Sequence, residues 1–126
     1  PALTVEENIL LPVWANKLPD SQRRLEWVYS LIPEIAQFRE RKAMQLSGGQ
    51  QKLVALARAL MPGHTLLLLD EPFEGVAPVL SRRLSEVIAK LGREGLCVLI
   101  SESDDTHSAD LVDALFRIER GSVTAG

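Results

Sequence analysis

Cysteine is nearly absent from this sequence. Cys97 is the single cysteine among 126 residues, so no disulfide can form within the chain, and this usage fits a reducing compartment. Long apolar runs are missing as well. The runs at residues 66–69 and 98–100, like all others in the chain, fall far short of the roughly 18 residues that a membrane-spanning helix needs. They have instead the length of buried strands, and Cys97 is expected to be a small core residue within one of them.

The chain also lacks an excess of basic residues. It has 14 Lys and Arg against 17 Asp and Glu, a formal net charge of −3, and the two signs are interspersed. A protein that binds nucleic acid usually shows a basic patch or stripe, so we expect no nucleic-acid partner. The hydrophobic fraction of 46% and the charged fraction of 25% are ordinary for a globular domain with a core of its own.

An initiator methionine is also missing. The first residue is Pro1, and no signal-peptide pattern follows it. We therefore expect the chain to be either a processed protein or an internal fragment of a longer one.

The first 60 residues have a helical pattern. Thr4 and Glu7 have the spacing of a capping box, which predicts a short helix that stops near Pro12. Apolar residues at helical spacing predict three further helices, at residues 21–32, 35–40 and 48–61. The aromatic residues among and after them, Trp14, Trp27, Phe38 and Phe116, are expected to pack in the interior.

The second half alternates between strand and helix patterns. Strands buried on both faces are predicted at residues 66–69 and 96–101, helices at 80–91 and 105–114, a third strand at 115–118, and a short last strand after Arg120-Gly121. Alternating strands and helices are typical of a parallel sheet covered by helices. The fold class is therefore α/β, with a helical region at the N-terminus.

Residues 46–50, Leu-Ser-Gly-Gly-Gln, interrupt the helical pattern. Ser47 can cap the helix that begins here, and Gly48 and Gly49 let its backbone approach another molecule closely. Free N–H groups at a helix start favour phosphate. On physical grounds alone, an ordinary capped helix after a glycine turn is the more common explanation.

Two acids follow the strand predicted at residues 66–69. Asp70 and Glu71 come at its carboxyl end, where α/β proteins bind their ligands. There Asp70 can coordinate Mg²⁺, directly or through water. Glu71 can orient or deprotonate an attacking water. The alternative is a strand that ends in two solvated acids.

The two motifs together resemble the ABC ATPase family. Leu46-Ser47-Gly48-Gly49-Gln50 matches the signature motif of that family, and Asp70 and Glu71 match its Walker B motif, about 20 residues further on. The resemblance covers residues 3–123. It implies that Ser47, Gly48, Gly49 and Gln50 contact the γ-phosphate of an ATP molecule held by a second subunit.

A narrower resemblance comes from the segment Gly75-Val76-Ala77-Pro78. It stands where the family has its D-loop, and it is similar to the variant in importers of branched-chain amino acids. The opening residues 3–8 and residues 26–29 are also similar to that subfamily. A helix start with Pro78 in its first turn is the plain alternative for this segment.

The sequence departs from the family in two respects. Ser103 stands where the family usually has a histidine that contacts the γ-phosphate, and branched-chain importers sometimes have glutamine there. In addition, no lysine follows a glycine, so the Gly-Lys-Ser/Thr of a Walker A motif is not present. The family has that motif upstream of its signature. We therefore expect a C-terminal fragment that neither binds nor hydrolyses ATP appreciably alone.

The resemblance implies a partial P-loop ATPase core at residues 62–126 and a helical subdomain at residues 1–61. ATP and Mg²⁺ are the expected cofactors of the intact parent, with none expected for this chain alone. The expected partners are a second ATP-binding subunit and transmembrane permease subunits, at the cytoplasmic face of the membrane. Unpaired strand edges also predict a strand-exchanged oligomer.

Two alternatives remain open at this point. A freestanding, non-enzymatic interaction module derived from an ABC ATPase is favoured by the substitution at Ser103. An ABC ATPase of DNA repair or chromosome structure is disfavoured by the short spacing between the motifs and by the acidic balance of the chain.

Overall fold

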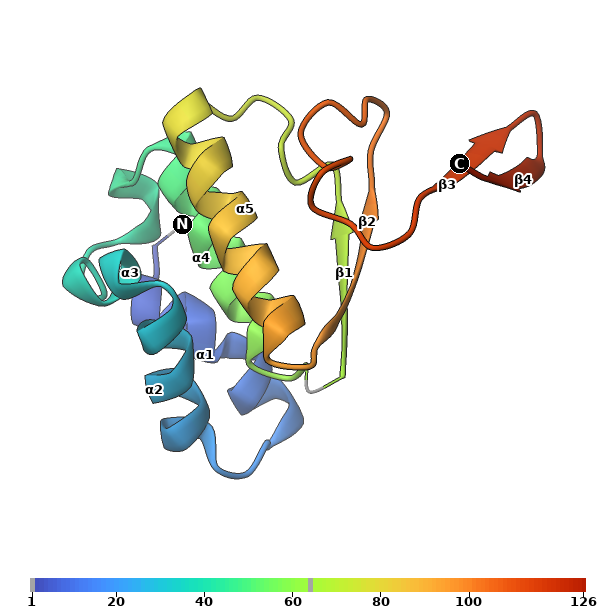
Figure 1. Ribbon diagram of the computed structural model, residues 1–126. Coiled ribbons are helices and arrows are strands. Elements are labelled where there is room, and N and C mark those ends of the chain that lie inside the picture. Colours follow the sequence, from blue (N-terminus) through green and yellow to red (C-terminus); the bar gives the residue numbers. More distant parts are fainter. Residues whose placement is uncertain (1, 64) are drawn as a thin grey trace.

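The computed structural model describes residues 2–63 and 65–126. A group of helices lies on one side, a pair of strands lies beside it, and a hairpin projects from the other end (Figure 1). In chain order, the elements are α1 (Val5–Asn16), α2 (Ser21–Leu31), α3 (Pro33–Gln37), η1 (Ala43–Gln45), α4 (Gly48–Leu60), β1 (Leu66–Asp70), α5 (Pro78–Arg93), β2 (Cys97–Ser101), β3 (Phe116–Glu119) and β4 (Ser122–Ala125).

Helix α1 begins as predicted but does not end as predicted. The Thr4 N–H donates to Glu7 Oε2 at 2.7 Å, and the Glu7 N–H donates to Thr4 Oγ1 at 3.2 Å, which confirms the capping box. The helix then runs through Pro12 to Asn16, so the predicted stop at Pro12 is wrong. Pro12 removes one backbone donor. Burial of Ile9 before it and Val13 after it offsets that loss, because both pack into the core.

The core lies between the helices and one face of the first two strands. Helix α1 packs against α4, and α5 packs against β2. The most buried large side chains of this core are Ile9, Ile32, Ile35, Leu53, Leu60 and Leu91. One hydrophobic cluster thus crosses residue 61, and the division of the chain into residues 1–61 and 62–126 stays a prediction. No helix among the described residues is long and apolar enough to cross a membrane.

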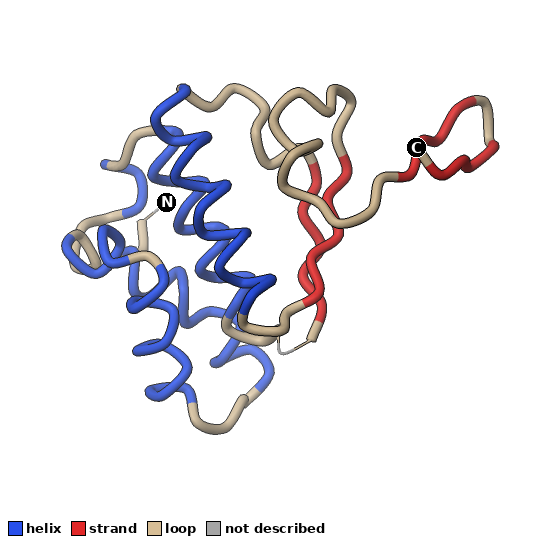
Figure 2. Tube along the Cα trace, viewed as in Figure 1, coloured by secondary structure: helices blue, strands red, loops and turns tan. Residues whose placement is uncertain are grey.

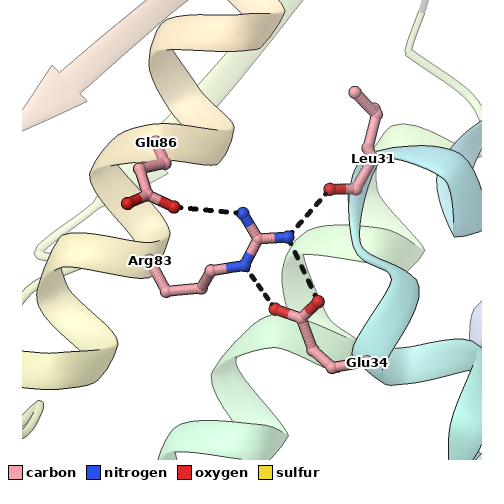
Figure 3. A network of polar contacts seen from close by, with 4 residues as sticks. All are labelled: Leu31, Glu34, Arg83 and Glu86. Carbon is pink, nitrogen blue, oxygen red and sulfur yellow. Dashed lines mark hydrogen bonds and ion pairs between the residues drawn. The ribbon is translucent and has the colours of Figure 1, made fainter.

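An arginine connects α5 to the N-terminal helices (Figure 3). Arg83 Nε lies 2.5 Å from Glu34 Oε1, and Arg83 Nη2 donates to Glu34 Oε2 at 3.1 Å, which makes the pair bidentate. The same Nη2 donates to the Leu31 carbonyl at 3.2 Å, at the end of α2. Arg83 Nη1 also lies 3.3 Å from Glu86 within α5. This network holds α5, and therefore the sheet beneath it, in place against α2 and α3.

Strands β1 and β2 form the predicted parallel pair, with Leu66 opposite Cys97 and Asp70 opposite Ser101. The prediction that both faces are buried is wrong. Leu67 is buried on the helical side, whereas Leu68 and Leu99 on the other side are 64% and 60% exposed. Cys97 is also exposed and is not a core residue. Alternate side chains of a strand point to opposite faces, and helices of the described chain cover only one face here.

The C-terminal region differs more from the sequence prediction. Strand β3 pairs with β4 in an antiparallel hairpin, not with the parallel sheet (Figure 2). Residues 105–111 form turns instead of a helix. The Asp104 carboxylate accepts the Thr106 N–H at 2.9 Å, and such local side-chain bonds compete with a helix. Phe116 and Trp14 are 62% and 54% exposed, so their predicted burial is wrong, whereas Trp27 and Phe38 do pack against the core.

Candidate nucleotide half-sites

The signature segment forms the start of α4. Ser47 is the N-cap, and its Oγ accepts the Gln50 N–H at 3.2 Å, while Gln50 Oε1 accepts the Ser47 N–H at 3.0 Å. This is a complete capping box. The Ser47 side chain faces solvent. The segment is therefore the exposed beginning of a helix, as the sequence predicts, and not a mid-helix segment.

Two backbone amides at this helix start are left over. The Gln50 N–H is capped, and the Gln51 N–H donates to the Ser47 carbonyl at 2.9 Å. The N–H groups of Gly48 and Gly49, the first two of the helix, have no partner among the described residues. Around Gly48, no heavy atom lies within 4 Å of an ideal Cβ, so an incoming group can approach its backbone. These amides and the positive end of the helix dipole suit an anion.

The acids lie at the carboxyl end of β1. Asp70 is its last residue, and Asp70 Oδ1 accepts the Ser101 hydroxyl at 2.6 Å from the neighbouring strand. Glu71 follows with a φ of 47°, a left-handed conformation that a non-glycine residue adopts at a cost of roughly 1–2 kcal/mol. The Glu71 N–H still donates to the Ser101 carbonyl at 2.9 Å, so the residue remains anchored to the sheet. The unusual φ turns the chain away from the strand direction directly after Asp70.

Ser103 binds Glu71. Its N–H donates to Glu71 Oε1 at 2.9 Å, and its hydroxyl donates to the same oxygen. The Ser103 hydroxyl lowers the pKa of Glu71 most, so this partly exposed carboxyl stays ionised at neutral pH. Burial raises the pKa of the neighbouring Glu102, and the Glu71 carboxylate raises it further. The two neighbouring carboxyls thus differ in acidity, and Glu71 is the stronger acid of the two.

The structure therefore brings the predicted residues into two groups. Asp70, Glu71 and Ser103 lie together at the end of the parallel pair, and residues 47–50 form the exposed start of α4. The sequence analysis missed Ser101, although the parallel register of the two predicted strands places it opposite Asp70. It also missed Lys52, for which the sequence carries no signal. The chemical roles of all these residues stay predictions.

The residues at the end of β1 fit a magnesium ion that also binds phosphate. Mg²⁺ takes oxygen ligands and usually needs only one or two carboxylates from the protein, since water and phosphate supply the rest. Asp70 is exposed, and only its Oδ1 accepts a hydrogen bond from a described residue. No group of three or more His, Cys, Asp and Glu among the described residues forms a closed metal cage. An open site with Asp70 as one ligand is consistent with this arrangement.

These features define an α/β protein with an exposed helix start and two acids at a strand end, and comparison identifies its family. The sequence model of the ABC transporter family matches residues 1–74. The chain belongs to the ABC transporter family, as an ATP-binding domain with the α/β fold predicted from the sequence.

Individual relatives agree with this assignment. The chain is 36% identical to the high-affinity branched-chain amino acid transport ATP-binding protein BraG of Pseudomonas aeruginosa, over 96% of the chain and 52% of that protein. It is 34% identical to the lipopolysaccharide export system ATP-binding protein LptB of Haemophilus influenzae, over 98% of the chain and 52% of that protein. The chain thus spans about half the length of these curated relatives.

A solved structure supports the same fold. The crystal structure of the ADP conformation of MJ1267, an ATP-binding cassette of an ABC transporter, superposes with a TM-score of 0.86. It is 27% identical, and the match covers 98% of this chain and 54% of that one. The predicted resemblance to the ABC ATPases is confirmed.

Proposed function

We propose that this chain is part of the ATP-hydrolysing subunit of an ABC importer of the branched-chain amino acid type. The similarity to a branched-chain amino acid transport ATP-binding protein supports the substrate class. The segment 75–78, which is similar to that subfamily, supports it as well. The exposed start of α4, where the amides of Gly48 and Gly49 have no partner among the described residues, is the observation that carries the nucleotide-binding part of the proposal.

The signature residues form one half of a nucleotide site. The amides of Gly48 and Gly49 point out from the end of α4 and attract the γ-phosphate of ATP bound to a second subunit. The capping bonds between Ser47 and Gln50 fix the backbone before ATP arrives, so little order is lost on binding. This half-site depends on a partner, because the phosphate loop comes from the other subunit.

The end of β1 forms half of another site. Asp70 binds Mg²⁺, which neutralises phosphate charge when it is bound. Glu71, ionised and held by Ser103, orients a water molecule and accepts its proton. Ser103 acts on hydrolysis through Glu71, since both of its donors are used there.

The partners of the working protein follow because each nucleotide site takes residues from two subunits. A second ATP-binding subunit pairs with this one, and transmembrane permease subunits hold both at the cytoplasmic face of the membrane. The 126-residue chain alone neither binds nor hydrolyses ATP appreciably, because each site needs a phosphate loop together with these residues. Binding of ATP to the isolated chain at sub-millimolar affinity in a calorimeter would contradict this part of the proposal.

The hydrolytic role is tested in the assembled transporter with Glu71→Gln. We expect the rate of hydrolysis to fall by about 10²–10⁴-fold while ATP binding persists, because the amide keeps the shape but cannot accept the proton. Glu74→Gln is the matched control, since Glu74 is an exposed glutamate in the same turn. Wild-type hydrolysis by Glu71→Gln would refute the assignment.

A further inference from the structure

Lys52 connects the two half-sites of the chain. It is the fifth residue of α4, one turn beyond the capping box. Its Nζ donates to the Glu74 carbonyl and lies 3.5 Å from the Pro72 carbonyl. Both carbonyls belong to the turn that follows Glu71. A single side chain from the signature helix therefore holds the backbone that leads away from the hydrolytic glutamate.

The turn itself has few bonds of its own. The Glu74 N–H donates to the Glu71 carbonyl at 3.2 Å, and the Val76 N–H donates to the Phe73 carbonyl at 3.4 Å. Glu71 and Gly75 both have positive φ, at 47° and 66°. Such a short, strained turn depends on outside contacts to hold one geometry. Lys52 supplies such contacts from α4.

A second contact joins the same two pieces of chain. Leu80, near the start of α5, packs so closely on Gly49 that an ideal Cβ at position 49 lies 1.8 Å from Leu80 Cδ2. The segment from Glu71 to α5 is thus held at its beginning by Lys52 and at its end by the contact at Gly49. Both contacts come from the first two turns of α4.

We propose that Lys52 is a positioning residue that makes the signature half-site and the hydrolytic half-site of one chain move together. The inference rests on the proposed function of these two half-sites. When a nucleotide held by the second subunit draws the start of α4 toward it, Lys52 transmits this displacement to the turn after Glu71. The state of one ATP site then affects the alignment of the glutamate in the other.

A lysine suits this role because its ammonium has three donors and can serve two carbonyls at once. Its charge also interacts favourably with the Glu71 carboxylate. Arginine keeps both the charge and several donors, whereas methionine keeps the length of the stem and loses the donors. The pair Lys52→Arg and Lys52→Met therefore separates the hydrogen bonds from simple packing.

The first experiment measures hydrogen exchange in the 126-residue chain. We expect Lys52→Met to speed exchange at the Glu74 and Val76 amides by about fivefold, since the turn loses its hydrogen bonds to α4. Lys52→Arg should resemble the wild type, and so should Lys90→Met, which removes an exposed lysine of α5. Unchanged exchange at these two amides in Lys52→Met would overturn the proposal.

The second experiment measures ATP hydrolysis by the assembled transporter. Lys52→Met should lower kcat by about tenfold with KM for ATP unchanged, because it misaligns Glu71 without touching the nucleotide. Lys52→Arg should restore most of kcat. A rise in KM alone would overturn the proposal, since Lys52 would then be a binding residue. If the wild-type assembly does not hydrolyse ATP, the proposed function fails, and the exchange measurement still decides whether Lys52 holds the turn.

Discussion

Leu80 Cδ2 occupies the place where an alanine at position 49 would have its β-carbon. The ideal Cβ would lie 1.8 Å from Leu80 Cδ2 and 3.2 Å from Leu80 Cγ. A side chain at the second glycine of the signature segment therefore forces Leu80 to shift, apart from any approach of a nucleotide. Gly48 differs, because an ideal Cβ there has no heavy atom within 4 Å.

Alanine substitutions at the two adjacent glycines should differ in their effect on the free energy of unfolding. Gly49→Ala should lower the free energy of unfolding by about 1 kcal/mol, because the clash with Leu80 exceeds the gain in helix propensity. Gly48→Ala should leave it unchanged or raise it by up to about 1 kcal/mol. Urea unfolding of the 126-residue chain measures both. The double variant Gly49→Ala/Leu80→Ala should show a favourable coupling of about 1 kcal/mol, and additive effects would exclude the clash.

Local signals in the sequence were sufficient to predict the helices that begin with a capping residue and the strands that lie in a short apolar run. The capping residues Thr4 and Ser47 mark the starts of α1 and α4 as the sequence predicts. The same local reasoning failed at Pro12, where burial on both sides of the proline decides the outcome. It also failed for burial of β1, because which face is covered depends on residues distant in sequence.

The site could be predicted in part for the same reason. The positions of Ser47 and Asp70 follow from one helix start and one strand end. The contact between Ser103 and Glu71, by contrast, depends on the positive φ of Glu71 and on the path of the chain after β2. No local sequence pattern encodes that backbone angle or that path of the chain. The link from Lys52 to the turn after Glu71 is likewise a product of tertiary packing.

The ion pair of Glu34 and Arg83 makes the stability of the chain depend on pH. Burial raises the pKa of Glu34, but the hydrogen bonds from Arg83 and from its own backbone outweigh this and hold the pKa below its usual 4.5. A depressed pKa in the folded state stabilises the protein above the unfolded pKa, and this contribution is lost as pH falls through the folded value.

Glu34→Gln should therefore cost about 1 kcal/mol at pH 7, since the pair is partly exposed, and the difference from wild type should shrink as pH falls through the lowered folded pKa. Urea unfolding between pH 3 and 7 measures this difference. Glu86→Gln is the control, because that carboxylate is 68% exposed and lies 3.3 Å from the same arginine. A deficit of Glu34→Gln that stays constant from pH 7 to pH 3 would show that the ionised pair is not its cause.

Ser103 should affect catalysis and not nucleotide affinity. In the assembled transporter, Ser103→Ala removes one of two donors to Glu71, so we expect kcat to fall by about three- to tenfold with KM for ATP unchanged. A residue that contacts the γ-phosphate directly would instead raise KM. Ser85→Ala, at a half-buried serine of α5, is the control and should match the wild type in both constants.

The open face of β1 and β2 should make the 126-residue chain associate with itself. Leu66, Leu68 and Leu99 are 50%, 64% and 60% exposed on this face, and each strand has an unpaired edge within the described part of the chain. Such a surface favours pairing with a second copy at micromolar concentrations.

Leu68→Lys/Leu99→Glu places opposite charges on directly opposed residues of the two strands, which preserves their pairing but makes the face polar. We expect sedimentation to show oligomers for the wild type and a monomer for this variant. Val79→Lys is the control, because Val79 is 73% exposed and belongs to α5, not to either strand. It should associate like the wild type. A wild-type chain that sediments as a monomer throughout this concentration range would contradict the prediction, since the apolar face would then remain exposed to solvent.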